Sequence, residues 1–263
     1  MSEANGPSVN EVNGPSVSKV NGPSVSKVNG PSVSKANGPS VSKANGPSVS
    51  KANGPITMLR LLYQFPTWMQ RLYPGVLWRK DQDRKVVYLT FDDGPIPECT
   101  PQILDILAQY GVKATFFMVA ENAVRYPHLL ERIRQEGHSI GNHTYHHLRG
   151  CQVATSRYLD DVEKAAQILD TKLFRPPHGR MKGRQKRALL AQGYTICLWD
   201  VLTHDYNPNY SVEHMMKVIQ RFTRNGSIIT CHDSNKSKDR IVDLLPQMIE
   251  WLLREGYRLE VIG

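Results

Sequence analysis

Between residues 86 and 263, short apolar runs alternate with longer stretches in which apolar residues recur at helical spacing. Short apolar runs bounded by turn residues are typical of buried strands, and apolar positions three and four apart are typical of helices. The runs predict seven strands, over residues 86–91, 114–119, 138–142, 173–175, 194–199, 227–231 and 257–262. Alternating strands and helices predict a parallel α/β sheet, and seven units are enough to curl it into a barrel.

Capping residues, prolines and glycines mark the ends of the helices between these strands. Thr100-Pro101, for example, opens a helix that ends at Gly111. The predicted helices lie over about 100–110, 126–136 and 156–169, before Gly193, after Ser211 and over about 240–255.

The first fifth of the chain follows another pattern, because an eight-residue unit, Asn-Gly-Pro-Ser-Val-Ser-Lys-Val/Ala, recurs six times from Asn5 to Ala52. Each unit has too little apolar surface to offset the entropy lost on ordering. We therefore expect residues 1–55 to be a disordered tail, either a flexible tether or a tandem duplication without a role.

Residues 56–79 are apolar but are interrupted by arginines, glutamines and prolines, so they are too broken to span a bilayer. We expect 56–85 to form a leading helix packed on the domain, with peripheral membrane contact through 56–79 as the alternative. The first residues also lack a basic and apolar signal region, so the sequence leaves the location and the oligomeric state open.

Charge and cysteine content narrow the function classes. The net charge is +9, and the five lysines and two glutamates of residues 1–52 account for +3, which leaves +6 for the rest. This mild excess suits an acidic surface such as a cell wall, but no Lys/Arg cluster interleaved with aromatic residues points to a nucleic-acid partner. The four cysteines have no close spacing typical of a zinc knuckle or redox motif.

Ionisable residues gather where the predicted strands end. They are Asp92 and Asp93 after the first strand, His143 and His147 after the third, Arg175 at the end of the fourth, Asp200 after the fifth and His232 after the sixth. Barrels and open parallel sheets build active sites at the carboxyl ends of their strands. We therefore expect these residues to meet at one edge.

Two of these groups have the spacing of metal ligands. His143 and His147 lie four residues apart, which lets both imidazoles face one ion, although His146 competes for the role. Two histidines and one aspartate would leave the fourth position of a tetrahedral zinc open for water. Of the adjacent carboxylates one can bind the ion and the other act as base, and His232 is placed to act as acid.

The motifs Thr90-Phe91-Asp92-Asp93-Gly94-Pro95, His143-Thr-x-x-His147, Arg175-Pro-Pro and Ile-Ile-x-x-His232-Asp233 resemble the successive motifs of the polysaccharide deacetylase family. This is the NodB homology domain of carbohydrate esterase family 4, and the resemblance covers about residues 57–262. It implies a distorted (β/α)7 barrel in residues 86–263. It also implies metal-dependent removal of N-acetyl groups from N-acetylglucosamine-containing polysaccharides or oligosaccharides.

The resemblance also implies roles for single residues. Asp92 would be the general base, held ionised by Arg175, and His232 would protonate the leaving amine. Asp93, His143 and His147 would hold a divalent ion, usually zinc and sometimes cobalt, nickel or manganese. A main-chain N–H near His178 would stabilise the oxyanion. The remaining residues expected to bind the carbohydrate substrate are Pro177, His178, Asp205, Tyr206 and Thr230.

Some positions depart from the family pattern. His178 stands where tyrosine or phenylalanine is usual, which alters the groove wall, and Thr230 replaces a leucine, which makes the acyl pocket more polar. In the fourth motif only Asp205 and an aromatic residue, Tyr206, are in register. Asp200 is therefore a shifted candidate for tuning His232.

Two other functions stay open from the sequence. A relative of the same fold could remove a formyl or other acyl group from a lipid-linked or nucleotide sugar, and another could bind carbohydrate without turnover. The intact set of base, ligands and acid argues against a pure binder. The substrate class suggests the cell envelope, while no export signal is legible and a cytoplasmic location stays open.

Overall fold

The computed structural model of the chain describes residues 63–263, so the predicted disordered tail at 1–55 lies outside the described residues. Within them the central strand is β2 (Val86–Asp92), which is buried along its whole length. It pairs with β3 (Thr115–Met118) on one side and β8 (Ser227–His232) on the other. The remaining strands are β1 (Val76–Leu77), β4 (Ser139–Asn142), β5 (Leu173–Phe174), β6 (Thr195–Cys197), β7 (Val201–Leu202) and β9 (Arg258–Leu259).

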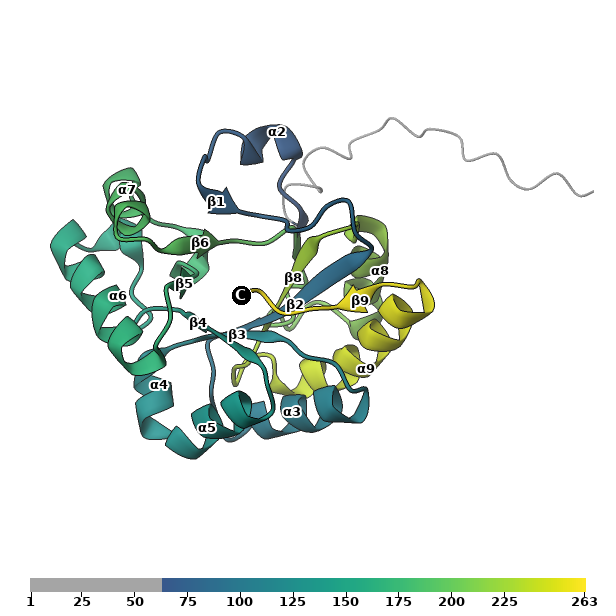
Figure 1. Cartoon of the computed structure of the whole chain (residues 1–263). Coiled ribbons are helices and arrows are strands. Elements are labelled where there is room, and N and C mark those ends of the chain that lie inside the picture. The colour runs from purple at the N-terminus through teal and green to yellow at the C-terminus, as the bar shows by residue number, and fades with distance from the viewer. Residues whose placement is uncertain (1–62) are drawn as a thin grey trace, which may run out of the picture. The chain divides into compact units, whose positions relative to one another are not determined.

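These strands form one parallel sheet in the order β1-β6-β5-β4-β3-β2-β8-β7, and β9 pairs with the start of β2. The sheet curls around a central axis with helices on its outer side (Figure 1). The curled parallel sheet with its outer helices confirms the predicted distorted (β/α)7 barrel class.

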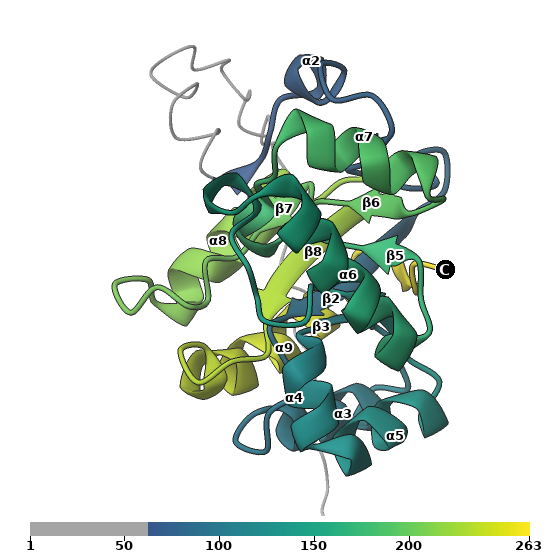
Figure 2. The ribbon, with the colours of Figure 1, turned by 90° about the vertical axis from the view of Figure 1, so that its left-hand side faces the viewer.

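The helices surround the strands on most sides, with α6 and α7 over one part of the sheet and α3, α4 and α5 below it in Figure 2. The predicted helices are present in the described residues, together with α4, which the sequence analysis missed. Their bounds are α2 (Thr67–Gln70), α3 (Thr100–Gln109), α4 (Ala120–Arg125), α5 (Pro127–Gln135), α6 (Thr155–Leu169), α7 (Gly183–Ala191), α8 (Val212–Phe222) and α9 (Lys238–Arg254).

Side chains along β2 alternate between two apolar clusters, as the two-residue period of a strand requires. Val87, Leu89 and Phe91 belong to the large cluster that also contains the buried faces of α3 and α9. Val86 and Tyr88 belong to a smaller cluster. That smaller cluster fills the interior of the curl, and the inward positions continue along β2 through Thr90 to Asp92.

The C-terminal segment closes the interior at the end where the strands begin. Ile262 is buried, its N–H donates to Thr115 Oγ1 at 2.9 Å, and its carbonyl accepts from Ser139 Oγ at 2.5 Å. Figure 1 shows the C-terminus at the middle of the curled sheet. Functional groups are therefore left to the opposite end, where the strands finish.

Two short strands differ from the sequence analysis, and the leading segment lies only partly within the described residues. β1 and β7 have two residues each, which is too short for a recognisable period. Of the leading helix predicted over 56–85, residues 56–62 lie outside the described residues. Tyr63 is helical, and residues 64–85 hold the four-residue α2, β1 and loops, so one continuous helix does not run through them. Pro66 directly precedes α2 and Pro74 follows it. Proline lacks the backbone N–H that would let a longer helix run through either position.

The surface gives two further findings on the leading segment and the charge. Trp68, Leu72 and Tyr73 are exposed, and the peripheral membrane contact proposed for 56–79 stays a prediction. Among the described residues no helix has the length and hydropathy needed to cross a membrane.

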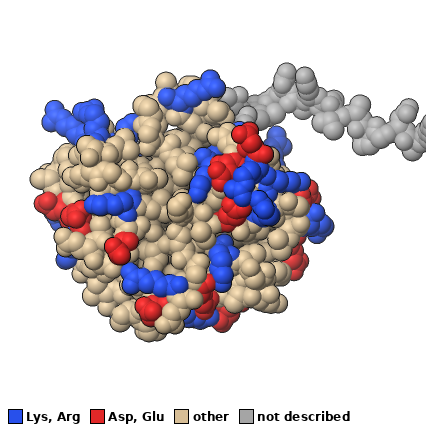
Figure 3. Space-filling model, viewed as in Figure 1, with Lys and Arg blue, Asp and Glu red and all other residues tan. Residues whose placement is uncertain are grey.

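On the face shown in Figure 3, basic and acidic side chains are interspersed around an uncharged middle.

Candidate active site and metal centre

The end of β2 turns two adjacent carboxylates in different directions. Asp92 is the last residue of the strand, and its side chain points into the buried interior with 4% of its surface exposed. Asp93 has the left-handed backbone conformation, with φ of 81°, and its side chain is 30% exposed. A non-glycine residue in this conformation is strained, and such residues cluster at functional sites. The strain at Asp93 separates the two carboxylates.

Asp93 meets both predicted histidine ligands. Its Oδ1 lies 3.2 Å from His147 Nε2 and 3.6 Å from His143 Nε2, and one ligand atom from each residue lies within 4.8 Å of the others. The structure therefore brings together the two histidines that the spacing indicated and the aspartate that the resemblance implied. Two imidazole nitrogens and one carboxylate oxygen form a donor set typical of catalytic zinc, so the residues present fit a divalent cation.

The hydrogen bonds of His143 settle which ring nitrogen is available to an ion. His143 Nδ1 lies 2.8 Å from the carbonyl oxygen of Arg175. Because a carbonyl only accepts, Nδ1 carries the proton and Nε2 presents its lone pair to Asp93 and His147. Burial lowers the pKa of His143 to about 4, so the ring is neutral near pH 7.

The carboxylate of Asp93 is ionised in the same environment. Burial raises its pKa, but the hydrogen bond from His147 and the charges of His232, His143 and His147 outweigh burial and hold the pKa well below its usual range. An ionised carboxylate beside a neutral imidazole is the protonation state that metal binding requires.

His146, the alternative ligand, is engaged elsewhere. Its Nδ1 lies 2.5 Å from Asp161 Oδ1, and Asp161 Oδ2 accepts from the N–H groups of Tyr145 and His146. Asp161, on α6, therefore fixes the loop that carries the histidine ligands. The sequence analysis missed Asp161, because nothing in the helical pattern of α6 distinguishes it from a surface carboxylate.

Asp92 is paired with Arg175, as the resemblance implied. Arg175 is fully buried, and its Nη1 donates to Asp92 Oδ1 at 2.6 Å and to Thr90 Oγ1 at 2.8 Å. Its Nη2 donates to the carbonyl of Leu198, and its guanidinium lies 3.9 Å from the centre of the Phe117 ring. A buried guanidinium requires a counter-charge, and Asp92 lies in position to supply it. Oδ2 of Asp92 has no partner among the described residues.

His232 lies opposite these carboxylates, since Asp92 and His232 are register partners on β2 and β8. His232 Nδ1 is 2.7 Å from Asp205 Oδ1, and its backbone N–H donates to Asp205 Oδ2 at 2.7 Å. Burial lowers the pKa of His232, but the charge and hydrogen bond of Asp205, together with Asp93 and Asp92, raise it to about 9. The ring is therefore protonated near pH 7.

This contact corrects two predictions. Asp200 was expected to tune His232, but its carboxylate accepts from Arg224 at 2.6 Å and from Ser227 Oγ at 2.7 Å. Its N–H donates to the carbonyl of Ile228, near the start of β8, whereas His232 ends that strand, roughly 13 Å further on at about 3.3 Å per residue. Asp205, predicted to bind substrate, is fully buried and is the residue that positions His232.

Replacing Asp200 by asparagine is therefore expected to lower stability and to spare catalysis. The change leaves the guanidinium of Arg224, which is 29% exposed, without its buried counter-charge, and Arg79 lies only 3.7 Å from the same carboxylate. We expect the free energy of unfolding to fall by about 2–4 kcal/mol in denaturant titrations. A change in the pH profile of turnover at unaltered stability would instead restore Asp200 as a residue that tunes His232.

The remaining predicted substrate residues fall into two groups. Pro177 and His178 lie on the 3₁₀ turn Pro177–Gly179, where His178 is exposed, and the ring of Tyr206 packs edge-on against His232 at 4.7 Å. Thr230, by contrast, has no accessible surface, and its hydroxyl lies 3.1 Å from that of Thr90. The prediction that Thr230 borders the acyl group is wrong for this structure, because Thr230 belongs to the buried layer beneath the site.

Two supporting residues of the Asp93 loop were also missed. Asn122, on α4, donates from Nδ2 to the carbonyl of Asp93 at 2.9 Å. Gly94 lies so close to Asp233 that a Cβ there would be 2.0 Å from Asp233 Oδ2, so only glycine fits. The Gly94-Pro95 pair indicated a turn in the sequence, but the close approach to Asp233 carried no local signal.

Two cavities flank the ring contact between His147 and His178, whose centroids are 4.9 Å apart. One, of about 480 Å³, is lined by Asp93, His147 and residues of α4 and of the loop after β8. The other, of about 360 Å³, is lined by His178 and residues next to the two 3₁₀ turns. The larger cavity therefore reaches the candidate metal centre, and the smaller one lies next to His178.

Comparisons with known proteins agree with this geometry. The family model described as "Polysaccharide deacetylase" matches residues 79–197. A peptidoglycan-N-acetylglucosamine deacetylase of Bacillus cereus is 31% identical over 194 residues, which is 72% of this chain and 91% of the relative. A chitooligosaccharide deacetylase of a Bradyrhizobium species is 31% identical over 66% of this chain and 87% of the relative.

Among solved structures, the Bc1960 peptidoglycan N-acetylglucosamine deacetylase, in complex with 4-naphthalen-1-yl-N-oxidanyl-benzamide, superposes with a TM-score of 0.71. It is 32% identical, and the match covers 75% of this chain and 95% of that chain.

Proposed function

The chain belongs to the polysaccharide deacetylase family, and from this premise we propose that it is a metal-dependent hydrolase that removes N-acetyl groups from glycans containing N-acetylglucosamine. The observation that carries the proposal is the separation of two adjacent carboxylates. Asp93 faces His143 and His147, whereas Asp92 faces Arg175. Amide hydrolysis at a metal centre needs a ligand set and a separate base side by side.

Asp93, His143 and His147 would hold the cation, and we propose zinc because the donor set is two imidazoles and one carboxylate. Cobalt, nickel or manganese could replace it, since affinity at such a site depends on metal supply as well as geometry. When bound, the ion would supply Lewis-acid chemistry, polarising the acyl carbonyl and making water more acidic.

Asp92 would take the proton from the attacking water. Its Oδ1 is held by Arg175, which leaves Oδ2 to accept that proton. The hydrogen bond from the guanidinium fixes the orientation of the carboxylate before substrate binds. A main-chain N–H near His178 is our candidate for the oxyanion contact, because His178 adjoins His147.

His232 would give a proton to the amine nitrogen as the C–N bond breaks, which releases the free amine and acetate. Asp205 fixes the ring through Nδ1 and keeps it protonated, so Nε2 can carry the proton that is transferred. The base and the acid lie opposite each other on neighbouring strands, about 5 Å apart along the hydrogen-bonding direction. They therefore flank one reacting group.

The proposed substrate is a polymer or oligomer of the peptidoglycan or chitooligosaccharide type, because these are the substrates in the names of the two relatives. A location in the cell envelope follows from that substrate class and is part of the proposal.

The function is tested by measuring acetate release from chitooligosaccharides and peptidoglycan by the zinc-loaded protein as pH is varied. We expect release that needs the metal and that declines above about pH 9, because His232 then loses the proton it must donate. Replacing Asp205 by asparagine removes the main cause of the raised pKa of His232. The pH above which acetate release declines should then move toward the ordinary pKa of histidine, about 6.5. At pH 8 this variant is then expected to be about thirtyfold slower.

Asp239→Asn, on the first turn of α9, is the matched control and should keep the wild-type profile. No acetate from either substrate class would exclude the deacetylase, and a decline that stays near pH 9 in the Asp205 variant would exclude His232 as the acid.

A further inference from the structure

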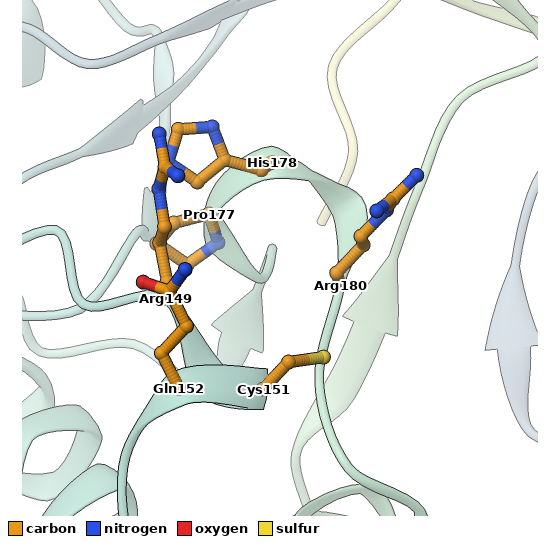
Figure 4. Close-up of a pocket in the computed structure, with 6 residues that line it drawn as sticks. All are labelled: Arg149, Cys151, Gln152, Pro177, His178 and Arg180. Atoms are coloured by element: carbon orange, nitrogen blue, oxygen red, sulfur yellow. The ribbon is translucent and has the colours of Figure 1, made fainter.

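The charged side chains that line the smaller of the two cavities are all basic. Its volume is about 360 Å³, and it lies between the 3₁₀ turns Gly150–Gln152 and Pro177–Gly179. Figure 4 shows Arg149 beside His178 on one wall, Arg180 on the other and Cys151 below. Two guanidinium groups thus line the cavity, and no carboxylate does. The lining residues are Arg149, Cys151, Gln152, Pro177, His178 and Arg180.

Arg149 is held in place by the histidine that departs from the family pattern. Its Nε donates to His178 Nε2 at 3.2 Å. A guanidinium only donates, so His178 Nε2 accepts this hydrogen bond. The ring of His178 in turn contacts that of His147, so the basic wall begins one side chain away from the metal ligands. A phenylalanine at this position could not accept the bond.

Neither arginine has an acidic partner among residues 63–263, unlike the described arginines that form ion pairs. Arg132, for example, pairs with Asp105 and Glu136 at 2.6 Å each. The terminal nitrogens of Arg149 and the whole guanidinium of Arg180 have no hydrogen bond or ion pair within the described residues. Two guanidinium forks of this kind match the geometry of a carboxylate, which accepts two parallel N–H bonds.

We propose that this cavity is a subsite for a carboxylate-bearing sugar unit that adjoins the unit losing its acetyl group. Its volume falls in the range of small-ligand sites, about 300–1,000 Å³. Arg149 and Arg180 would bind the carboxylate, and the chain would therefore prefer an acidic glycan to a neutral chitooligosaccharide. The role of this subsite in deacetylation rests on the proposed function, whereas binding of the carboxylate does not.

Binding can be measured without turnover through Cys151. It lies in the cavity and is exposed, whereas the other three cysteines are buried, so a neutral alkylating reagent such as iodoacetamide reports occupancy of the cavity. The probes are an N-acetylglucosamine disaccharide that carries a carboxyalkyl ether on one ring and the same disaccharide with that acid converted to an amide. The protein is the zinc-loaded full chain with Asp92→Asn.

We expect the acidic disaccharide to protect Cys151 at about tenfold lower concentration than the amide, in line with charge-assisted hydrogen bonds, and to lose this advantage in high salt. In the Arg149→Gln/Arg180→Gln double variant, the two probes should protect Cys151 at the same concentration. Arg254→Gln, at the far end of α9, is the matched control and should keep the preference.

Equal protection by both probes, or a preference that survives in the double variant, would overturn the subsite. Turnover separates this failure from failure of the proposed function. In the chain with Asp92 intact, acetate release with no preference for the acidic probe and no effect of the two arginines would keep the deacetylase and reject the subsite. Protection with the expected preference, but no acetate from either probe, would keep the subsite and reject the deacetylase.

Discussion

Replacing Asp92 by asparagine is expected to lower kcat by about 10²–10⁴-fold while zinc binding is retained. Asparagine keeps the shape of the side chain but cannot take a proton from water. The ion should remain, because Asp93, His143 and His147 do not include Asp92. The measurement is acetate release at saturating substrate, together with zinc content of the same sample.

Stability must be followed in this variant. Asp92 is the counter-charge of the buried Arg175, so its loss should also lower the free energy of unfolding by roughly 3–5 kcal/mol. Asp83→Asn, an exposed carboxylate just before β2, is the control and should change neither quantity. A folded Asp92→Asn protein with nearly wild-type turnover would show that the base lies elsewhere.

Replacing His147 by alanine is expected to lower both metal affinity and activity. It removes one of three ligands and leaves Asp93 and His143 to hold the ion alone. We expect a loss of at least about 10³-fold in turnover at low free zinc, because the ion supplies both the polarised carbonyl and the more acidic water. Turnover should be measured in zinc-buffered solution, so that affinity and rate can be separated.

His146→Ala is a matched control for this change, because His146 is in the same loop but is bonded to Asp161. The His146→Ala change should lower activity only through increased mobility of this loop. Its activity should not depend on added zinc more than that of the wild type. If the two histidine variants were equally impaired in zinc affinity, the assignment of His147 as the ligand would be wrong.

Much of the fold could be predicted because its core strands are long or strongly apolar. β2 is a seven-residue strand with every residue buried, and Gly94-Pro95 marks the turn after it. β1 and β7 have two residues each, so their place in the sheet depends on neighbours distant in sequence. In the leading segment, the helix predicted over 56–85 does not continue through the described residues after Tyr63, a stretch that contains Pro66 and Pro74.

The two candidate histidine ligands could be predicted because their spacing is local, whereas the choice of Asp93 over Asp92 depended on the family resemblance. His143 and His147 lie in one loop, and Asp93 directly follows a buried strand. Asp200 and Asp205 could not be told apart in this way, because both are fully buried and both follow the same predicted strand. Only the break between β6 and β7, which places Asp200 at one end of β8 and Asp205 at the other, assigns their roles.

Electrostatic roles were likewise out of reach of the sequence. The neutral state of His143 and the raised pKa of His232 depend on burial and on contacts with Arg175 and Asp205, which lie 32 and 27 residues away along the chain. The charge pattern of the Arg149 and Arg180 cavity also depends on two turns that are separated in sequence.

The central claim is that Asp93, His143 and His147 form one binding site for a divalent cation, and calorimetric titration of metal-free protein with zinc tests it most directly. We predict that the wild type binds one ion per chain. Zinc binding should release more protons as the pH of the titration is lowered toward the pKa of His143, about 4. Affinity for zinc should fall in the Asp93→Asn and His147→Ala variants but not in His146→Ala. Failure of the wild type to bind zinc or cobalt, or equal affinity in all of these proteins, would contradict the account.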